Sequence, residues 1–229
     1  MIVGNGMISK SFKSSNICNK NLCVFASGVP NSLEIDEKEY EKEFLLLKQV
    51  YNNNQEKKFI YFSTSSIETG KKSRYISHKI KIENYIESNF NDFLIVRLPN
   101  IIGFSSNRSQ LVPYLYQNLI QNKKLYIKKK CFRFLIDVED LPSIIECLIK
   151  SKTTKKIITI NFNNKIEVSE IVEILSKINS IYNKELVEVS SDFEKLPNNK
   201  FFISLIEKYN YGFNIDPFEI LNKYYNNLS

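Results

Sequence analysis

The chain has 229 residues, 43% of them hydrophobic, and a formal net charge of +7 at pH 7. This length is enough for one α/β core with a small appendage, or for two small domains. The four cysteines form no Cys-x-x-Cys pair and the chain holds a single histidine. We therefore expect no metal site and a reduced, cytoplasmic setting.

The apolar residues are broken into short runs, and no run approaches the roughly 18 residues of a membrane span. Residues 1–3 lead directly into glycine, without an apolar signal segment. The lysines are dispersed through asparagine-rich stretches, apart from the run at 128–130, and no basic helix or stacking motif accompanies them. We expect neither a membrane nor a nucleic acid as partner.

Strand and helix patterns alternate along the chain, which predicts an α/β fold with a parallel sheet covered on both faces. In the first part we predict strands at residues 1–3, 22–26, 59–63 and 93–98, and helices at 7–14, 37–51 and 75–89. The inward stripe of the second helix consists of Tyr40, Phe44, Leu47 and Tyr51. In the second part we predict strands at 132–136 and 157–162 and helices at 111–121, 138–149 (capped by Asp137), from 169 onward, and 218–228 (opened by Asp216 and Pro217).

The first predicted turn reads Gly4-Asn5-Gly6-Met7-Ile8-Ser9, a Gly-x-Gly-x-x-small pattern between a strand and a helix. Gly4 permits a tight turn, Gly6 lets a pyrophosphate approach the backbone, and the small Ser9 allows close packing of the helix. The pattern predicts dinucleotide binding, although a glycine pair alone can be a simple turn.

The most informative spacing in the chain is that of Thr64, Tyr75 and Lys79. Tyr75 and Lys79 form a Tyr-x-x-x-Lys pair, one turn apart on a predicted helix, and Thr64 ends the strand before it. A lysine ammonium lowers the pKa of a nearby phenol, so we expect Tyr75 to exchange a proton with a substrate oxygen that Thr64 also binds.

Together these segments resemble the extended short-chain dehydrogenases/reductases that act on nucleotide sugars. The resemblance covers nearly the whole chain and implies a Rossmann-like core over residues 1–103. The remainder, 104–229, is then mostly a small α/β substrate-binding part, with residues near 132–162 returning to the core. It assigns catalysis to Thr64 (or Ser65), Tyr75 and Lys79. It assigns cofactor contacts to Gly4, Gly6, Met7, Ile8, Ala26, Ser27, Gly28, Ser63, Tyr75, Lys79, Pro99 and Ile102, and substrate contacts to Ser65, Asn100 and Arg133.

The sequence also departs from that family. Residues 15–21 stand where the family inserts two strands and a helix, and no acidic residue occurs between Gly4 and Glu34 to hold the adenosine ribose. Lys10, Lys13 or Lys20 could instead meet a phosphate, which slightly favours NADPH over NADH as the NAD(P) cofactor. Glu68 replaces a usual aromatic residue and could be a base or a solvated loop carboxylate.

The resemblance implies NAD(P)-dependent reduction of a keto nucleotide sugar, of the 4-keto reductase type, in surface glycan synthesis. Ser65 and Ser66 lack the acidic pair of the dehydratases, and a loosely held cofactor suits a reductase better than an epimerase. An epimerase and a non-catalytic nucleotide-sugar binding relative remain the alternatives, and a homodimer is common in the relatives.

Three of the residues near this motif have simpler explanations. His78 matches no catalytic position and is expected to pack or to face solvent. Arg97 could pair with an acid of the preceding helix, and Glu83 could be the structural partner of Lys79.

Overall fold

The computed structural model describes residues 1–15, 17, 21–105, 107–181, 184–189, 199–209 and 212–226. Lys20 and the last two residues of the predicted 218–228 helix lie outside these ranges. The chain divides into two compact units, the first formed by Met1–Leu98, Val138–Ile160 and Lys195–Tyr211 and the second by Pro99–Asp137, Asn161–Glu194 and Gly212–Ser229.

The first unit is built on a parallel sheet of five strands in the order β1-β2-β3-β4-β9. Its strands are β1 (Ile2–Val3), β2 (Leu22–Phe25), β3 (Lys58–Thr64), β4 (Phe93–Leu98) and β9 (Lys156–Thr159). Its helices are α1 (Met7–Lys13), α2 (Glu37–Asn52), α3 (Arg74–Asn89), α5 (Leu141–Lys150) and α7 (Lys200–Tyr209), with 3-10 turns η1 (Ser65–Thr69) and η2 (Val138–Asp140). The predicted α/β parallel sheet is confirmed.

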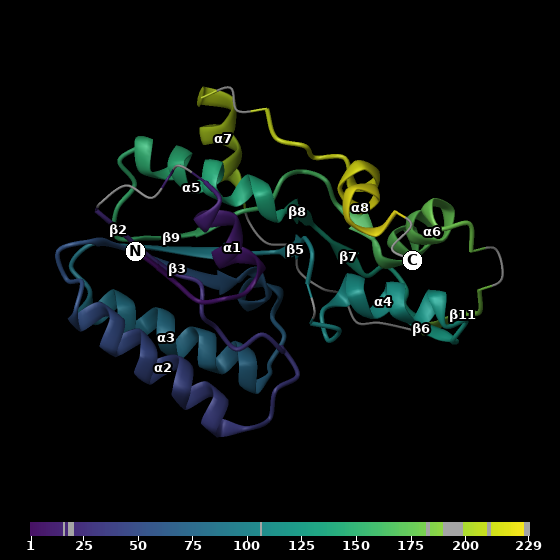
Figure 1. The fold of residues 1–229 in the computed structure, drawn as a ribbon, viewed down its shortest axis with the longest axis horizontal. Helices are drawn as coiled ribbons and strands as arrows, with labels where there is room; N and C mark the ends of the chain where they lie inside the picture. The colour runs from purple at the N-terminus through teal and green to yellow at the C-terminus, as the bar shows by residue number, and fades with distance from the viewer. Residues whose placement is uncertain are drawn as a thin grey trace. The chain divides into compact units, whose positions relative to one another are not determined.

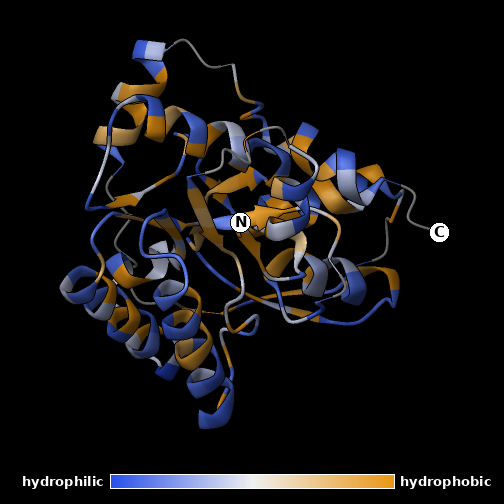
Figure 2. Cartoon of the chain, turned by 60° about the vertical axis from the view of Figure 1, so that its left-hand side comes forward, coloured by the Kyte–Doolittle hydropathy of each residue, from blue (hydrophilic) through white to orange (hydrophobic). Residues whose placement is uncertain are grey.

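Different helices cover the two faces of this sheet (Figure 1). One face packs on α2 and α3 in a core that contains Cys23, Phe25, Leu47, Tyr51, Phe59, Tyr61, Ile82, Ile86, Phe93 and Ile95. On the opposite face, Phe62 contacts Phe12 of α1, with ring centroids 5.7 Å apart. Because side chains alternate between the faces of a strand, strands buried on both sides read as continuous apolar runs, and Figure 2 shows them mostly hydrophobic.

The connection through α1 has an unusual hand. The steps β1–β2, β2–β3 and β3–β4 run in the same direction across the sheet, yet α1 lies on the face opposite to α2 and α3 (Figure 1). The crossovers through α2 and α3 therefore share one hand and the α1 crossover has the other. Since parallel crossovers are right-handed in about 98% of cases, we take the α1 crossover as the exception.

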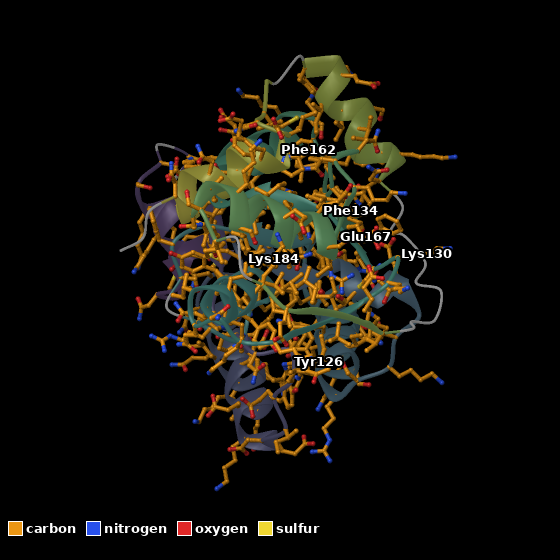
Figure 3. All side chains as sticks on the ribbon, turned by 90° about the vertical axis from the view of Figure 1, so that its right-hand side faces the viewer. Tyr126, Lys130, Phe134, Phe162, Glu167 and Lys184 are labelled. Carbon is orange, nitrogen blue, oxygen red and sulfur yellow. The ribbon has the colours of Figure 1, made fainter. Side chains whose placement is uncertain are left out.

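The second unit contains three two-stranded sheets and three helices among its described residues. Its strands are β5 (Asn100–Ile102), β6 (Leu125–Lys128), β7 (Phe132–Arg133), β8 (Leu135–Asp137), β10 (Ile166–Glu167) and β11 (Leu186–Val189), and its helices are α4 (Leu111–Ile120), α6 (Val168–Ile178) and α8 (Pro217–Tyr225). β10 pairs antiparallel with β7, and near this pair the Lys130 amide donates to the Glu167 carboxylate at 2.6 Å (both residues are labelled in Figure 3).

The structure corrects several predicted elements of the second part of the chain. The predicted strand 132–136 is two short strands, β7 and β8, separated at Phe134. The predicted helix 138–149 is the 3-10 turn η2 followed by α5, whose N-cap position is Asp140 rather than Asp137. The Asp137 carboxylate accepts hydrogen bonds from the Tyr224 hydroxyl at 2.5 Å and the Lys223 ammonium at 2.7 Å. The missed elements are β5, β6, β10, β11 and α7. The strands among them are two to four residues long and pair with segments distant in sequence.

Among the described residues, every helix is too short or too polar to cross a membrane.

The aromatic cluster under β3 generates a stability prediction. Phe59 is fully buried, and its ring lies 4.9 Å from that of Phe90 and 5.9 Å from that of Phe25. Phe59→Ala should lower the free energy of unfolding by about 3–5 kcal/mol, because a cavity remains where the ring packed. Leu45→Ala, at a 56% exposed position of α2, should change it by no more than about 0.5 kcal/mol. Urea unfolding measures both, and equal losses would contradict this view of the core.

Candidate functional site

The glycine turn between β1 and α1 packs directly on the end of β2. Gly4 has a φ of +118°, and a Cβ there would lie 2.4 Å from the Ala26 carbonyl oxygen, so only glycine fits. A Cβ on Gly6 would meet nothing within 4 Å. Lys13 donates from Nζ to the Gly4 carbonyl at 3.1 Å. The turn is therefore closed against β2 at Gly4 and open at Gly6.

The carboxyl end of β3 carries three hydroxyl side chains. Ser63 is 5% exposed, and its Oγ has no hydrogen-bond partner among the described residues. Thr64 Oγ1 accepts from the Ser66 amide at 3.2 Å and so begins η1, while Ser65 is buried. Accepting that bond leaves the Thr64 hydroxyl proton available for a ligand.

Helix α3 places Tyr75 and Lys79 next to each other. The helix begins at Arg74 because the Ser73 hydroxyl accepts from the Ile76 amide at 3.1 Å. Lys79 Nζ lies 5.6 Å from the centroid of the partly buried Tyr75 ring. The Tyr-x-x-x-Lys pair thus shares one helix face, one turn apart.

The Lys79 ammonium is buried, with the residue only 2% exposed, and Glu43 of α2 is its charge partner. Lys79 Nζ donates to Glu43 Oε1 at 2.7 Å and to the Tyr61 hydroxyl at 2.9 Å. The Tyr61 hydroxyl in turn donates to Glu43 Oε1 at 2.8 Å. Glu83, the partner that the sequence suggested for Lys79, does not fill this role.

Glu43 is satisfied on both carboxylate oxygens. Its Oε2 accepts from the Val29 amide at 2.9 Å and lies 3.1 Å from His78 Nε2. Burial alone would raise the pKa of Glu43, but Lys79, His78 and the Val29 amide together lower it to about 2. Because an ionised carboxylate only accepts hydrogen bonds, His78 carries a proton on Nε2. His78 is thus a packed residue, and its ring is tilted against that of Tyr40 with the centroids 4.7 Å apart.

The pKa of Tyr75 is raised overall, although Lys79 acts to lower it as the sequence predicted. Burial of the phenol is the main cause of the raised pKa. The Lys79 ammonium lowers the pKa, and the Glu43 carboxylate raises it. Burial of the phenol outweighs the effect of the Lys79 ammonium, and the Glu43 carboxylate opposes part of that effect. Tyr75 is accordingly a neutral phenol at pH 7.

Gly28 connects the loop after β2 to this charge pair. A Cβ at Gly28 would lie 2.9 Å from Lys79 Nζ and 3.3 Å from Glu43 Oε1. The loop that contains Ala26, Ser27 and Gly28 therefore reaches both the glycine turn, through Gly4, and the lysine. These contacts connect the carboxyl ends of β1 and β2 with the first turns of α3.

Arg97 is held by two carboxylates within the first unit. Its Nη2 and Nε donate to the two oxygens of Glu83 at 2.6 and 3.0 Å, and its Nη1 donates to Glu68 at 3.2 Å. Thr159 also donates to Glu68. The pairing of Arg97 with a helix acid, suggested by the sequence, is confirmed, and Glu68 is a partner in this network rather than a solvated loop carboxylate.

The remaining predicted residues, Pro99, Asn100, Ile102 and Arg133, belong to the second unit. The backbone amide and the side-chain Nδ2 of Asn100 donate to the Phe134 carbonyl at 3.2 and 3.5 Å. Arg133 Nη1 donates to the Phe132 carbonyl at 2.6 Å. Asn100 is the first residue of β5, which pairs with β8, and Arg133 is the last residue of β7.

The sequence analysis did not select Glu43 or Tyr61. One signal for Glu43 was present: it lies three residues after Tyr40 and four before Leu47, within the inward stripe of α2. A carboxylate that becomes buried when the helix packs needs a hydrogen-bond donor or a cation as its partner. The spacing of residues along α2 does not show which residue that partner is.

Solved structures of other proteins share this fold. UDP-glucose 4-epimerase from Thermotoga maritima, solved with UDP-glucose, matches with a TM-score of 0.70 at 13% identity, over 95% of this chain and 81% of that one. dTDP-glucose 4,6-dehydratase from Bacillus anthracis, in complex with NAD, matches with a TM-score of 0.69 at 15% identity, over 96% and 77%. RMD from Pseudomonas aeruginosa, complexed with NADPH, matches with a TM-score of 0.68 at 14% identity, over 96% and 85%.

The chain has the fold of the nucleotide-sugar epimerases and dehydratases. No protein-family model and no curated protein sequence matches it. The chain spans 77–85% of the length of these three structures. In the described sheet β1 is an edge strand, paired with β2 alone.

The buried pair generates a prediction about stability and pH. Glu43→Gln should lower the free energy of unfolding at pH 7 by about 3–5 kcal/mol, because it leaves the Lys79 ammonium buried and unpaired. A carboxylate whose pKa is lowered to about 2 stabilises the fold above its ordinary pKa near 4.5 and loses that contribution as the pH falls towards 2. The difference in the free energy of unfolding between wild type and variant, measured by urea unfolding, should therefore become smaller below pH 4.5.

Two variants serve as controls for this measurement. Glu39→Gln removes an exposed carboxylate that pairs with Lys42 on the same helix and should leave stability within about 1 kcal/mol. Glu43→Gln combined with Lys79→Met removes both buried charges and should recover much of the loss. A difference in unfolding free energy between wild type and Glu43→Gln that stays constant from pH 7 to pH 2.5 would show that the stabilisation does not come from the ionised Glu43 carboxylate.

Proposed function

We propose that the protein is an NAD(P)-dependent reductase of a keto nucleoside-diphosphate sugar, of the 4-keto reductase type, acting in the synthesis of surface glycan sugars. The observation that carries the proposal is the line of contacts from Gly4 through Ala26 and Gly28 to Lys79 and Tyr75. It joins a phosphate-type glycine turn to a proton-donating group. The likeness in fold to enzymes solved with NAD, NADPH and UDP-glucose supports the same assignment.

The residues of the first unit fit a dinucleotide. A Cβ built on Gly6 would have no other atom within 4 Å. This open space suits a pyrophosphate that lies against the backbone. The buried Ser63 hydroxyl lacks a partner among the described residues, so it is free to bind a polar group at the edge of the sheet. Lys13 stands beside the turn, which favours the additional phosphate of NADPH over NADH.

The opposite hand of the α1 crossover supports this position for the ligand. The loops after β1 and β2 lead to helices on opposite faces of the sheet. In open α/β sheets, ligands bind in the crevice outside the carboxyl ends of the strands, and the two loops diverge at that end of β1 and β2. The shortened first unit thus keeps the arrangement of loops that a dinucleotide site requires.

The side chains have distinct roles in the proposed reaction, for which a bound nicotinamide supplies the hydride. Thr64 donates a hydrogen bond to the carbonyl oxygen of the sugar and orients it. Tyr75 donates its proton to the same oxygen as the alcohol forms. Lys79 holds the ribose side of the site. Asn100 and Arg133 of the second unit remain the contacts predicted from the sequence for the sugar and its pyrophosphate.

The state of Tyr75 favours reduction over epimerisation. Reduction of a carbonyl consumes a proton and needs an acid, whereas an epimerase first removes a proton from a hydroxyl and needs a base. Burial keeps Tyr75 protonated. Elimination, as in a dehydratase, lacks an acid and base pair next to Thr64, where Ser65 and Ser66 stand.

Cofactor binding is the first prediction of this proposal. Titration with NADPH and NADH, followed by nicotinamide fluorescence, should show saturable binding, tighter for NADPH. Gly6→Arg should weaken it at least about tenfold by filling the open side of the turn, a loss of about 1.4 kcal/mol or more.

Gly212→Arg is the matched control for that titration. Gly212 also has nothing within 4 Å of an added Cβ, but it belongs to the second unit, so its variant should bind as the wild type does. If neither cofactor binds up to millimolar concentration, the reductase proposal fails and the non-catalytic nucleotide-sugar binding protein takes its place.

Catalysis is the second prediction. With a panel of 4-keto nucleoside-diphosphate sugars, oxidation of NADPH at 340 nm (the standard nicotinamide signal) should fall by about 10²–10⁴-fold in Tyr75→Phe, because the general acid is lost. Tyr40→Phe is the control, since the Tyr40 hydroxyl donates to the Glu34 carbonyl at 2.7 Å and has no catalytic role. Sugar interconversion without net oxidation of NADPH would identify an epimerase instead.

A further inference from the structure

Glu43 has more donors than a structural ion pair needs. It is 4% exposed, and its two oxygens receive the Lys79 ammonium, the Tyr61 hydroxyl, the Val29 amide and the His78 ring. These donors come from α3, β3 and the loop after β2, so the carboxylate joins the three segments that carry the proposed site. Glu43 itself is on α2, one helix away from Tyr75.

The geometry leaves the Lys79 ammonium little freedom. Two of its donors are directed to Glu43 and Tyr61, and Gly28 approaches so closely that a Cβ there would lie 2.9 Å from Nζ. Moving Lys79 towards the Tyr75 hydroxyl would leave Glu43 buried without its main counter-charge, which is strongly unfavourable.

We propose that Glu43 is a positioning residue of the site: it holds the Lys79 ammonium beneath Gly28 and offsets part of the charge that this ammonium presents to the Tyr75 phenol. This inference rests on the proposed function and adds to it. The common expectation for a Tyr-x-x-x-Lys pair is an ammonium that stabilises a phenolate. In this chain the carboxylate opposes part of that effect, and burial of the phenol is the main reason why Tyr75 remains a proton donor, suited to reduction.

The charged and titratable groups around Tyr75 are few. Lys79 lies on its own helix, Glu43 and Tyr40 come from α2, and Tyr61 comes from β3. Lys79 acts to lower the pKa of Tyr75, and Glu43 acts to raise it. Tyr40 and Tyr61 have raised pKa values themselves and are neutral at pH 7. Among these groups, Glu43 is therefore the one whose charge opposes the effect of the Lys79 ammonium on the pKa of Tyr75.

The test is a pH titration of the free protein labelled with [¹³Cζ]tyrosine and followed by NMR. Tyr75→Phe identifies the Tyr75 resonance in each background. In Glu43→Gln the midpoint of Tyr75 should fall by about one pH unit or more relative to the wild type, the size expected when a charge within about 4–6 Å loses its compensation. An unchanged midpoint would overturn the positioning role.

Two further variants keep the test decisive if Glu43→Gln folds poorly, with circular dichroism at each pH as the check. Lys79→Met leaves Glu43 unopposed and should move the midpoint upward, or abolish the titration. Glu43→Gln with Lys79→Met removes both charges and should return Tyr75 towards its wild-type behaviour. If the double variant keeps the shift of Glu43→Gln, Glu43 does not act through Lys79 and the inference is wrong.

The chain offers a matched control in its second unit. Asp137 is also a buried carboxylate that accepts from a tyrosine hydroxyl and a lysine ammonium, those of Tyr224 and Lys223. Asp137→Asn should alter the Tyr224 resonance and leave Tyr75 unchanged. Equal shifts of Tyr75 in Asp137→Asn and Glu43→Gln would show a general loss of packing and overturn the inference.

The NMR titration uses neither cofactor nor substrate, so its outcome is separable from that of the proposed function. A shifted Tyr75 in a protein that binds no nicotinamide would leave the charge arrangement intact and reject the reductase. Nicotinamide binding with an unshifted Tyr75 would keep the dinucleotide site and reject Glu43 as its positioning residue.

Discussion

The ion pair between Lys79 and Glu43 is the interaction on which the candidate site depends. Both groups are almost fully buried, and removing two charges from water is compensated only where the geometry is good and the remaining hydrogen bonds are made. Here Tyr61, His78 and the Val29 amide make them. The pair thereby ties α2, α3, β3 and the loop after β2 together at the carboxyl end of the sheet.

The sheet itself imposes the second constraint. β1 is an edge strand of two residues, reached through a crossover of opposite hand to those of α2 and α3. This connection places the glycine turn against Ala26, where the φ of Gly4 and the close approach of the two backbones require a residue without a Cβ. A shortened first unit therefore retains the contacts between the ends of β1 and β2.

Much of the first unit could be predicted from sequence because its strands are buried on both faces. Runs such as Phe59 to Phe62 are apolar throughout, and the helices between them show a clear periodicity. The second unit was harder, since strands of two to four residues carry too short a pattern. Asp137 illustrates the difficulty: its position suggested a helix cap, but Tyr224 and Lys223, more than 80 residues later, bind it instead.

The sequence by itself determined the local features of the site. The spacing of Tyr75 and Lys79 places them one turn apart on any helix, and Gly4 marks a turn whose backbone conformation only glycine adopts readily. Only the tertiary structure decided which charge Lys79 meets. Glu43 lies 36 positions earlier, and its approach depends on how α2 and α3 pack on the sheet. That packing also sets the burial of Tyr75, so the protonation state of the phenol follows from long-range contacts rather than from the motif.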